Sequence, residues 1–401
     1  MTCDIQRSPA PLFSLLPAAL ARQREAFASQ IREGLACDGR TVAALPAWLP
    51  RPAPGLAGRA LVVDIGGTNV RAALVELRPG QALRVLAGPV TAAVPGVGDA
   101  TVSREAFFDA QARLVARLEP EPGLPLGYCF SYPARVLPCG DAELVCWTKD
   151  IRVPGVEGRR VGGLLRAALE RQGISVGPVR VLNDTVAALL AGAMQPGDYE
   201  HGIGLVVGTG SNMAAFFPRQ RLGKLALGAA GPAMAINLES GNLQLAELTG
   251  WDLELDIGSD NLGRQGFEKA VSGRYLPRVF LLAAEDPGAC DPDEGAGALV
   301  RLREQGSPSQ AELAGAVLDR SADLVACGLA AVLDCLPSGR CQVAAEGGLF
   351  WGAPGYAQRV RATLAELVGS EDRVHIAHIE DANLAGAAAA ALGPGWAQEI
   401  A

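Results

Sequence analysis

The stretch ALVVDIGGTNVRAALVEL, residues 60–77, decides the class of fold. ALVVDI is a short apolar run typical of a buried strand, GGTN carries the paired glycines of a turn, and VRAALVEL reads as a second strand. The stretch therefore predicts a β-hairpin. The same order returns at residues 203–217, where IGLVV, GTGSN and MAAFF follow one another. A repeat about 140 residues further along indicates a duplicated domain, each half of which presents a glycine-rich loop to one shared ligand.

The rest of the chain alternates between helical and strand spacing, which predicts an α/β fold. The length of 401 residues favours two domains. Before residue 60 we expect a helix and then a connector in the proline-rich stretch LPAWLPRPAPG (45–55). The later expected elements are helices at 159–174, 185–194, 308–335 and 383–392, a strand at 179–184, and a strand leading into a turn at 341–351.

Composition narrows the class of protein. Hydrophobic residues make up 49% and charged residues 19%, the balance of a packed enzyme. The net charge of −8 argues against nucleic acid or an anionic membrane as a partner, although a local basic patch can still bind a nucleotide phosphate. The nine cysteines are scattered and form no C-x-x-C pair, so we expect free thiols in a reducing compartment. We expect His375 and His378 to be ordinary structural histidines rather than metal ligands, because they lie on opposite faces of a short strand.

The N-terminus resembles a signal peptide only superficially. PLFSLLPAALA (11–21) ends in small residues, but Asp4 precedes it and Pro17 interrupts it. The next residues continue with helical spacing, so we expect a surface helix. No apolar run reaches the roughly 18 to 20 residues of a membrane span. We therefore expect a cytoplasmic protein.

The turn of the first hairpin, residues 64–69, is a candidate phosphate site. Paired glycines let backbone N–H groups approach an anion closely, and Thr68 and Asn69 add side-chain donors. Asp64 could hold Mg²⁺ directly or through water, and Arg71 could contact a phosphoryl oxygen. The alternative is a plain hairpin turn. A P-loop or a dinucleotide fingerprint is excluded, because a strand rather than a helix follows.

A second glycine-rich loop and a polar triplet complete the candidates. The glycines of GTGSN (208–212) likewise let backbone N–H groups approach an anion, and two loops from two halves could clamp a triphosphate. Asn183-Asp184-Thr185 stands at an expected strand-to-helix junction, where ligands gather in open α/β sheets. Taken alone, the triplet is most simply a helix cap. The alternative is a carboxylate that accepts the proton of an alcohol during phosphoryl transfer from ATP.

Six segments in order resemble the hexokinase family of the eukaryotic type. They are IREGLACDGRTVAALPAWLP (31–50), LVVDIGGTNVRAALVEL (61–77), FSYP (130–133), WTK (147–149), the run from GVEGRRVGGLLRAALERQGI to VRVLNDTVAALLAG (155–192), and GLVVGTGSNMA (204–214). The resemblance implies an actin-like ATPase fold of two ribonuclease H-like lobes with a cleft between them. The small lobe would hold residues 60–181 and 384–401, and the large lobe residues 1–59 and 182–383.

The resemblance also implies a reaction and a role for each matching residue. The reaction is transfer of the γ-phosphoryl group of ATP to the 6-hydroxyl of a hexose, glucose first among them, as the first step of glycolysis. Asp184 would be the general base, and Lys149 would orient the sugar and stabilise charge. Carboxylates and amides suit sugar hydroxyls because they accept and donate in fixed geometry. The implied sugar ligands are Ser131, Thr148, Lys149, Asn183, Asp184, Asn212, Glu239 and Glu268. The implied ligands of ATP and Mg²⁺ are Asp64 (for the metal), Gly66, Gly67, Thr68, Asn69, Arg71, Gly208, Thr209, Gly210 and Gly347.

Three segments depart from the family pattern. After Glu239 the family runs W-G-x-[FL]-G, whereas this chain has SGNL at 240–243, so the loop beside the sugar is reshaped. Asp150 follows WTK where the family has glycine. At the adenosine end, EGG (346–348) replaces D-G-[ST], and EDANLAGAA (380–388) replaces E-D-G-S-G-[KR]-G-A-A. These departures leave the preferred hexose and nucleotide open.

Three functions are weighed for the chain. The first, an active hexokinase or glucokinase, is expected. The second is a sugar-binding sensor that lost turnover through its changed adenosine segment, against which the retained Asp184, Lys149, Asp64 and Arg71 speak. The third is an actin-like kinase or phosphatase for another metabolite, against which the sugar segments speak. The chain is expected to be a monomer or a homodimer, and its lobes to close on the sugar, which would expel water.

Overall fold

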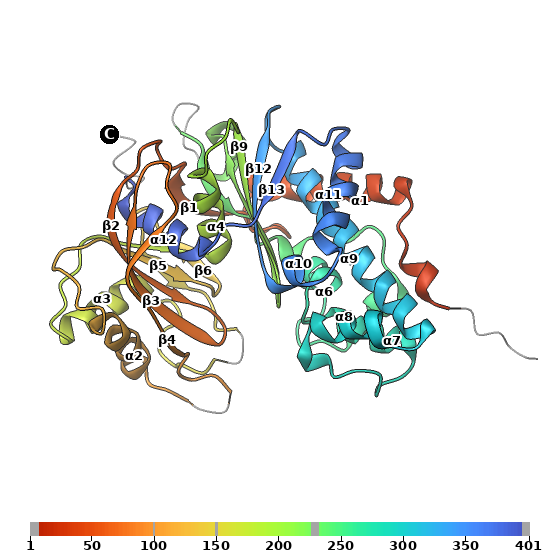
Figure 1. Ribbon diagram of the computed structural model, residues 1–401, viewed down its shortest axis with the longest axis horizontal. Helices are drawn as coiled ribbons and strands as arrows, with labels where there is room; N and C mark the ends of the chain where they lie inside the picture. Colours follow the sequence, from red (N-terminus) through yellow and green to blue (C-terminus); the bar gives the residue numbers. More distant parts are fainter. Residues whose placement is uncertain (1–7, 99–100, 149–150, 226–231, 395–401) are drawn as a thin grey trace, which may run out of the picture.

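Two open sheets, each flanked by helices, form the framework of the protein (Figure 1). The computed structural model describes residues 8–98, 101–148, 151–225 and 232–394. In each sheet an antiparallel hairpin is extended on one side by a third antiparallel strand and on the other by two parallel strands. The strand order β4-β3-β2-β5-β8 of one sheet is repeated as β11-β10-β9-β12-β13 in the other. The predicted duplication is confirmed.

The first sheet is buried on both faces. Leu61 and Val63 of β2 pack toward α2 (Arg104–Ala116) and α3 (Val161–Arg171), whereas Ala60 and Val62 pack toward α12 (Ala382–Leu392). Alternate residues of a strand point to opposite faces, so the consecutive apolar residues 60–63 of β2 require cover on both. The strands of this sheet are β2 Gly58–Ile65, β3 Asn69–Leu77, β4 Arg84–Ala93, β5 Leu126–Phe130 and β8 Val179–Leu182.

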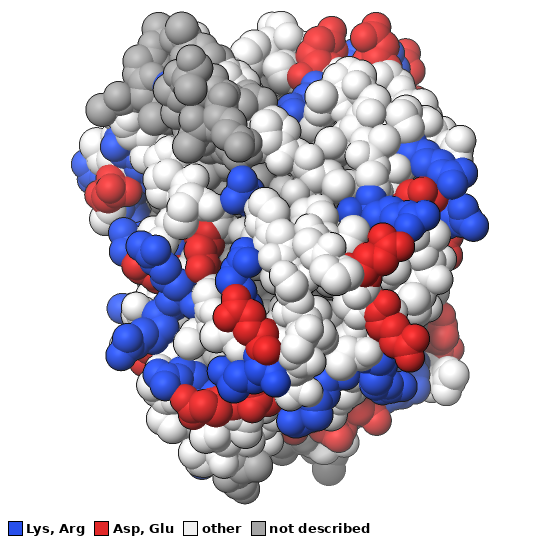
Figure 2. Space-filling model, turned by 90° about the vertical axis from the view of Figure 1, so that its left-hand side faces the viewer, with Lys and Arg blue, Asp and Glu red and all other residues white. Residues whose placement is uncertain are grey.

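The outer helices of the first sheet carry a mixed charge. Figure 2 shows this side of the molecule, with basic and acidic side chains interspersed. Arg171 on α3, for example, pairs with Asp109 on α2 at 2.6 Å. Exposed pairs of this kind contribute at most about 1 kcal/mol each to stability.

The second sheet packs between two groups of helices. Ile203, Leu205 and Val207 of β9 share a core with α1 (Pro17–Ala36) and α9 (Pro308–Asp334). On the other face lies α4 (Asp184–Ala193), which also contacts α12, so that both helices sit between the two sheets (Figure 1). The strands are β9 His201–Val207, β10 Ser211–Phe217, β11 Met234–Asn237, β12 Cys341–Glu346 and β13 Val374–Ala377, with β1 Leu45–Pro50 at the edge beside β11.

The remaining elements are added to the two sheets and their flanking helices. A short hairpin adjoins the first sheet, and a group of helices follows β11 on the side of the second. Their bounds are η1 Ala10–Phe13, β6 Ala134–Val136, β7 Ala142–Leu144, η2 Arg219–Arg221, η3 Gly223–Leu225, η4 Ser240–Asn242, α5 Gly250–Ile257, α6 Gly266–Val271, α7 Leu276–Ala284, η5 Pro292–Glu294, α8 Ala296–Gln305, α10 Gly348–Gly352 and α11 Tyr356–Val368.

Two sequence-based expectations about local structure were wrong. The proline-rich stretch is not only a connector, because its first six residues form β1, antiparallel to β11. Proline is tolerated there since an edge strand leaves one row of its backbone groups unpaired, and the register shifts between Pro46 and Pro50 around Trp48, whose φ is 53°. Likewise, the residues after β12 form the short helix α10 rather than a turn.

The expected N-terminal helix is confirmed. It starts at Pro17, whose fixed φ suits the first helical position, and its apolar residues Leu20, Phe27, Ile31 and Leu35 are buried in the core of the second sheet. Among the residues that the structure describes, no helix combines the length and the apolar character needed to cross a membrane.

Candidate active site

Asp184 stands at the junction of β8 and α4, as the sequence predicts. The cap of α4 is its neighbour Asn183, whose Oδ1 accepts from the Thr185 N–H at 2.9 Å. Oδ1 of Asp184 accepts from the same N–H at 2.7 Å and from the Thr185 hydroxyl at 3.2 Å. No described residue donates to the other carboxylate oxygen of Asp184. One oxygen of a half-buried carboxylate is thus fixed by the helix, and the second is available to an incoming proton donor.

Asp64 and Asp184 converge at the carboxyl ends of three parallel strands. Asp64 on β2 lies opposite Cys129 on β5, which lies opposite Leu182 on β8. Neighbouring strands are about 4.8 Å apart, so Leu182 lies about 10 Å from Asp64. Burial raises the pKa of the Cys129 thiol well above its ordinary value, and the carboxylates of both Asp64 and Asp184 raise it further. Both carboxylates therefore lie near the Cys129 thiol.

The first glycine-rich loop holds Asp64 in a polar cluster. Arg71 faces Asp64 across the hairpin and donates to its Oδ2 from Nη2 at 2.6 Å. Arg71 also lies 3.6 Å from Asp381, and the Asn383 amide lies 3.5 Å from the Asp64 oxygens. Burial would lower the pKa of Arg71, but the charge of Asp64, its hydrogen bond to Arg71 and the charge of Asp381 together outweigh burial, and the pKa is raised. The cluster offers both a cation and carboxylates, which suits a phosphate bound together with a divalent metal.

The tip of this loop is exposed while its base is fixed. The Gly66 N–H donates to the Asn69 carbonyl at 3.0 Å, and the Val94 N–H donates to the Thr68 carbonyl at 2.9 Å. The Tyr132 hydroxyl donates to the Gly66 carbonyl, which ties the loop to the segment after β5. Thr68 and Asn69 themselves are exposed. Donors at the tip remain accessible to an anion.

The second glycine-rich loop is held by backbone contacts from two directions. The carbonyls of Gly208 and Thr209 accept from the N–H groups of Gly273 at 2.7 Å and Arg274 at 3.3 Å. Gly347, just after β12, approaches the loop so closely that a Cβ atom added to it would lie 2.1 Å from the Val207 carbonyl oxygen. Only glycine fits this contact, and the φ of +117° at Gly347 also favours glycine. The loop and the end of β12 thus form one rigid surface.

Polar residues at the start of β10 and at the end of β11 form one hydrogen-bonded group. The Asn212 amide donates to Asn237 Oδ1 at 2.8 Å, and the Asn237 amide donates to Glu239 Oε1 at 2.7 Å. The Ser240 N–H donates back to Asn212 Oδ1 at 3.1 Å. Glu239 has a φ of 54°, so its carboxylate is held in place by these contacts against an unfavourable backbone conformation.

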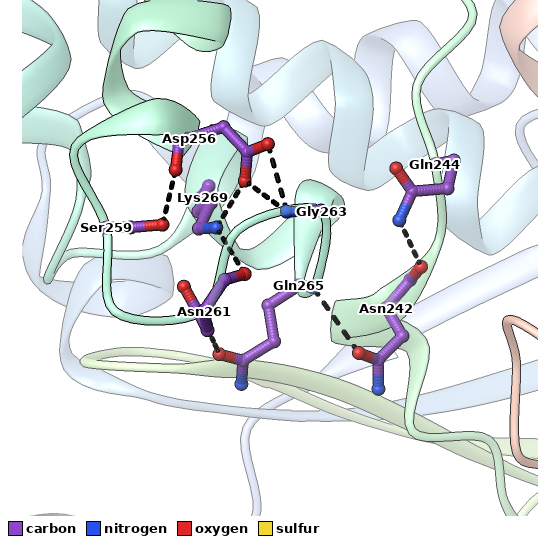
Figure 3. A network of polar contacts seen from close by, with 8 residues as sticks. All are labelled: Asn242, Gln244, Asp256, Ser259, Asn261, Gly263, Gln265 and Lys269. Carbon is purple, nitrogen blue, oxygen red and sulfur yellow. Dashed lines mark hydrogen bonds and ion pairs between the residues drawn. The ribbon is translucent and has the colours of Figure 1, made fainter.

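Glu268 on α6 connects to the second glycine-rich loop. Its Oε2 accepts from the Ser211 N–H at 3.0 Å, and its Oε1 accepts from Gln265 Nε2 at 3.1 Å. The Gln265 amide oxygen in turn accepts from the Asn261 amide (Figure 3). The carboxylates of Glu239 and Glu268 are therefore both held by hydrogen bonds near the second glycine-rich loop.

A partly buried ion pair between Lys269 and Asp256 supports this region. Lys269 Nζ donates to Asp256 Oδ1 at 2.5 Å and to the Asn261 carbonyl at 3.1 Å (Figure 3). Burial would raise the pKa of Asp256, but the Lys269 ammonium and the Gly263 N–H outweigh it and hold the pKa below its ordinary value. Asp256 is thus ionised at neutral pH and anchors the Asn261–Gln265 segment through Lys269.

The residues predicted from the small lobe lie beside these groups. Ser131 is buried directly after β5, and its N–H donates to the Ile65 carbonyl at 3.1 Å. Its neighbour Tyr132 lines a small cavity together with Asn183 and Asn237, so three of the polar segments meet there. Thr148 is half-buried, and Trp147 before it packs against Tyr132 with ring centroids 5.1 Å apart. Lys149 and Asp150 lie outside the described residues.

Comparison with known proteins shows the family. A family model described as Hexokinase matches residues 8–194, and a second with the same description matches residues 202–286 and 308–393. The chain belongs to the hexokinase family. The hexokinase of Schwanniomyces occidentalis is 28% identical over 435 residues, covering 94% of this chain and 90% of that protein. Hexokinase-2 of Rattus norvegicus is 34% identical over 270 residues, which are 64% of this chain and only 29% of that longer protein.

A solved structure shows the same fold. The hexokinase of Schistosoma mansoni complexed with glucose has a TM-score of 0.77, at 24% identity, and the match covers 95% of this chain and 97% of that one. The two-lobed α/β fold expected from the sequence is therefore confirmed for this hexokinase.

Sequence reasoning missed several polar residues of the site in this hexokinase. Asn237 could have been suspected, since it stands two residues before Glu239 and so on the same side of an extended chain. Asn242 and Gln265 gave no signal of their own. Their contacts join segments that are 23 residues apart and depend on how α6 packs.

Proposed function

We propose that this hexokinase transfers the γ-phosphoryl group of ATP to the 6-hydroxyl of a hexose, with Asp184 as the general base. The observation that supports it most is the environment of Asp184. One oxygen is fixed by Thr185, no described residue donates to the other, and the carboxylate lies, like that of Asp64, near the Cys129 thiol. A base placed in this way accepts the hydroxyl proton as the sugar oxygen attacks phosphorus. The product would enter glycolysis.

We assign the sugar to the surface between the two sheets. Carboxylates and amides fixed by neighbours bind hydroxyls without losing further freedom, which favours affinity and specificity. Lys149 is proposed to orient the sugar and stabilise charge. The proposed sugar ligands are Ser131, Thr148, Lys149, Asn183, Asp184, Asn212, Glu239 and Glu268. Glucose is the first hexose to test, since a solved relative is complexed with it.

We assign ATP to the two glycine-rich loops. Mg²⁺, when bound, neutralises charge on the phosphates, and Asp64 would hold it directly or through water. The Asp64–Arg71–Asp381 cluster fits this assignment, because a single buried carboxylate beside a guanidinium suits a metal whose other ligands are phosphates and waters. The proposed phosphate contacts are Gly66, Gly67, Thr68, Asn69, Arg71, Gly208, Thr209, Gly210 and Gly347.

We propose the lobe boundaries that the sequence predicts, 60–181 with 384–401 and 1–59 with 182–383. The packing of α12 on β2, β3, β5 and β8 supports adding the C-terminal helix to the small lobe. α4 lies where the lobes meet, so closure of the lobes would carry the small-lobe segments toward Asp184 and exclude water.

A coupled ADP-release assay tests the proposed function. Purified protein is offered glucose, fructose, mannose and an amino sugar, each with ATP, GTP or polyphosphate and Mg²⁺. We expect sugar-dependent ADP release with ATP, at a rate well above that without sugar. A protein that binds a hexose by calorimetry and yet forms no sugar phosphate with any sugar and any of the three phosphoryl donors would be a sensor instead.

A further inference from the structure

The loop after Glu239 contains a bridge between the two backbone segments that carry the carboxylates Glu239 and Glu268. This loop is the segment in which the chain departs from the family pattern. It begins at Glu239 with φ 54° and runs into contact with the start of α6, where Gln265 also has φ 54°. Neither position is glycine, so both backbone conformations need support from neighbours. Asn242 is the side chain that contacts both.

The bridge consists of hydrogen bonds in both directions. The backbone N–H of Asn242 and its side-chain amide both donate to the Glu239 carbonyl, at 3.1 and 3.3 Å. Its Oδ1 accepts from the Gln265 N–H at 3.4 Å (Figure 3). One residue later, the Leu243 carbonyl accepts from the Phe267 N–H at 2.8 Å. The loop thus provides acceptors for N–H groups at the start of α6 that have none within the helix.

The contact with Gln265 reaches Glu268 in one further step. Gln265 Nε2 donates to Glu268 Oε1, so the position of Gln265 contributes to the placement of that carboxylate, together with the Ser211 N–H. The packing around it is tight, since a Cβ atom added at Gly241 would lie 3.3 Å from Glu268 Cβ and 3.2 Å from the Ser211 carbonyl oxygen. A shift of the loop after Glu239 would therefore displace Glu268 or the second glycine-rich loop.

We infer that Asn242 is a positioning residue, which holds Glu239 and Glu268 at a fixed separation and so sets the affinity for the hexose. The inference rests on the proposed function, because it assumes that both carboxylates bind sugar hydroxyls. Asn242 acts through these two residues and does not itself contact the reacting atoms. Its loss therefore affects binding of the sugar more than the rate of the chemical step.

The test compares Asn242→Ala with Gln244→Ala in the ADP-release assay. Gln244 is a matched control, an exposed amide in the same loop that donates to the Asn242 carbonyl at 3.2 Å but makes no hydrogen bond to Glu239 or Gln265. We expect Asn242→Ala to raise KM for the hexose about tenfold, with kcat within about threefold and KM for ATP unchanged. Gln244→Ala should match the wild type. Asn242→Asp has the same shape and keeps the acceptor oxygen but loses the amide donor. It should raise KM for the hexose at least about threefold. This variant tests the positioning role if the alanine variant does not fold.

A double-mutant cycle separates positioning from a general loss of structure. In a Glu268→Gln background, Asn242→Ala should raise KM by a much smaller factor than in the wild type, because the group that it positions is already altered. Unchanged sugar KM in the folded Asn242 variants, or equal factors in both backgrounds, would overturn the inference while leaving the proposed function intact. A wild-type protein that phosphorylates no hexose would overturn both.

Discussion

Asp184→Asn is expected to lower kcat for hexose phosphorylation by about 10²-fold to 10⁴-fold, the usual contribution of a positioned general base. The substitution keeps the shape of the side chain and the oxygen that accepts from Thr185, so α4 should keep its N-terminus. It removes the basicity of the other oxygen. Sugar binding, measured by calorimetry without nucleotide, should weaken far less than turnover.

The control for this variant is Asp198→Asn, at an exposed carboxylate beyond the other end of α4. It changes the net charge by the same amount and should leave kcat within about twofold, as expected for a surface position. If Asp184→Asn turned over sugar at a near-normal rate, another group would have to be the base, and the assignment would fail.

Gly347→Ala is expected to lower the stability of the protein and to disturb the second glycine-rich loop. The new Cβ would lie 2.1 Å from the Val207 carbonyl oxygen, and the φ of +117° is unfavourable for alanine. Relief requires the end of β12 or the loop after β9 to move, at a cost of about 2–4 kcal/mol. We expect an apparent Tm lowered by about 2–5 °C, and a raised KM for ATP.

Gly348→Ala is the matched control, since a Cβ atom added there meets no atom within 4 Å and the position opens the helix α10. Its melting temperature and KM for ATP should stay near those of the wild type, or its stability should rise slightly through better helix propensity. Equal behaviour of the two variants would contradict a close contact between β12 and the second glycine-rich loop.

Much of the fold could be predicted because its two halves share one local pattern. Apolar runs on either side of a glycine-rich turn identify each hairpin, and the consecutive apolar residues 60–63 of β2 predict a strand covered on both faces. β1 could not be predicted in this way. Its prolines are typical of a connector, and its pairing partner β11 lies almost 190 residues further along the chain.

The candidate site could be predicted only as separate pieces. Asn183-Asp184-Thr185 is a helix cap by its local pattern, and the cap is indeed formed by Asn183. What makes Asp184 a candidate base is its place near Asp64, which depends on the register of β2, β5 and β8. The contact of Glu268 with Ser211 spans 57 residues and has no local signal at all. Such contacts are fixed by packing between elements, which spacing along the sequence does not encode.

The most direct test of the account is the identity of the product. Glucose, ATP, Mg²⁺ and the protein are incubated, and the product is examined by phosphorus and carbon NMR. The account predicts a single sugar phosphate with phosphorus attached to the oxygen on carbon 6, formed in equal amount with ADP, and no product from 6-deoxyglucose. Phosphorylation at another hydroxyl, or phosphorylation of the 6-deoxy sugar, would contradict the proposed placement of the hexose against Asp184.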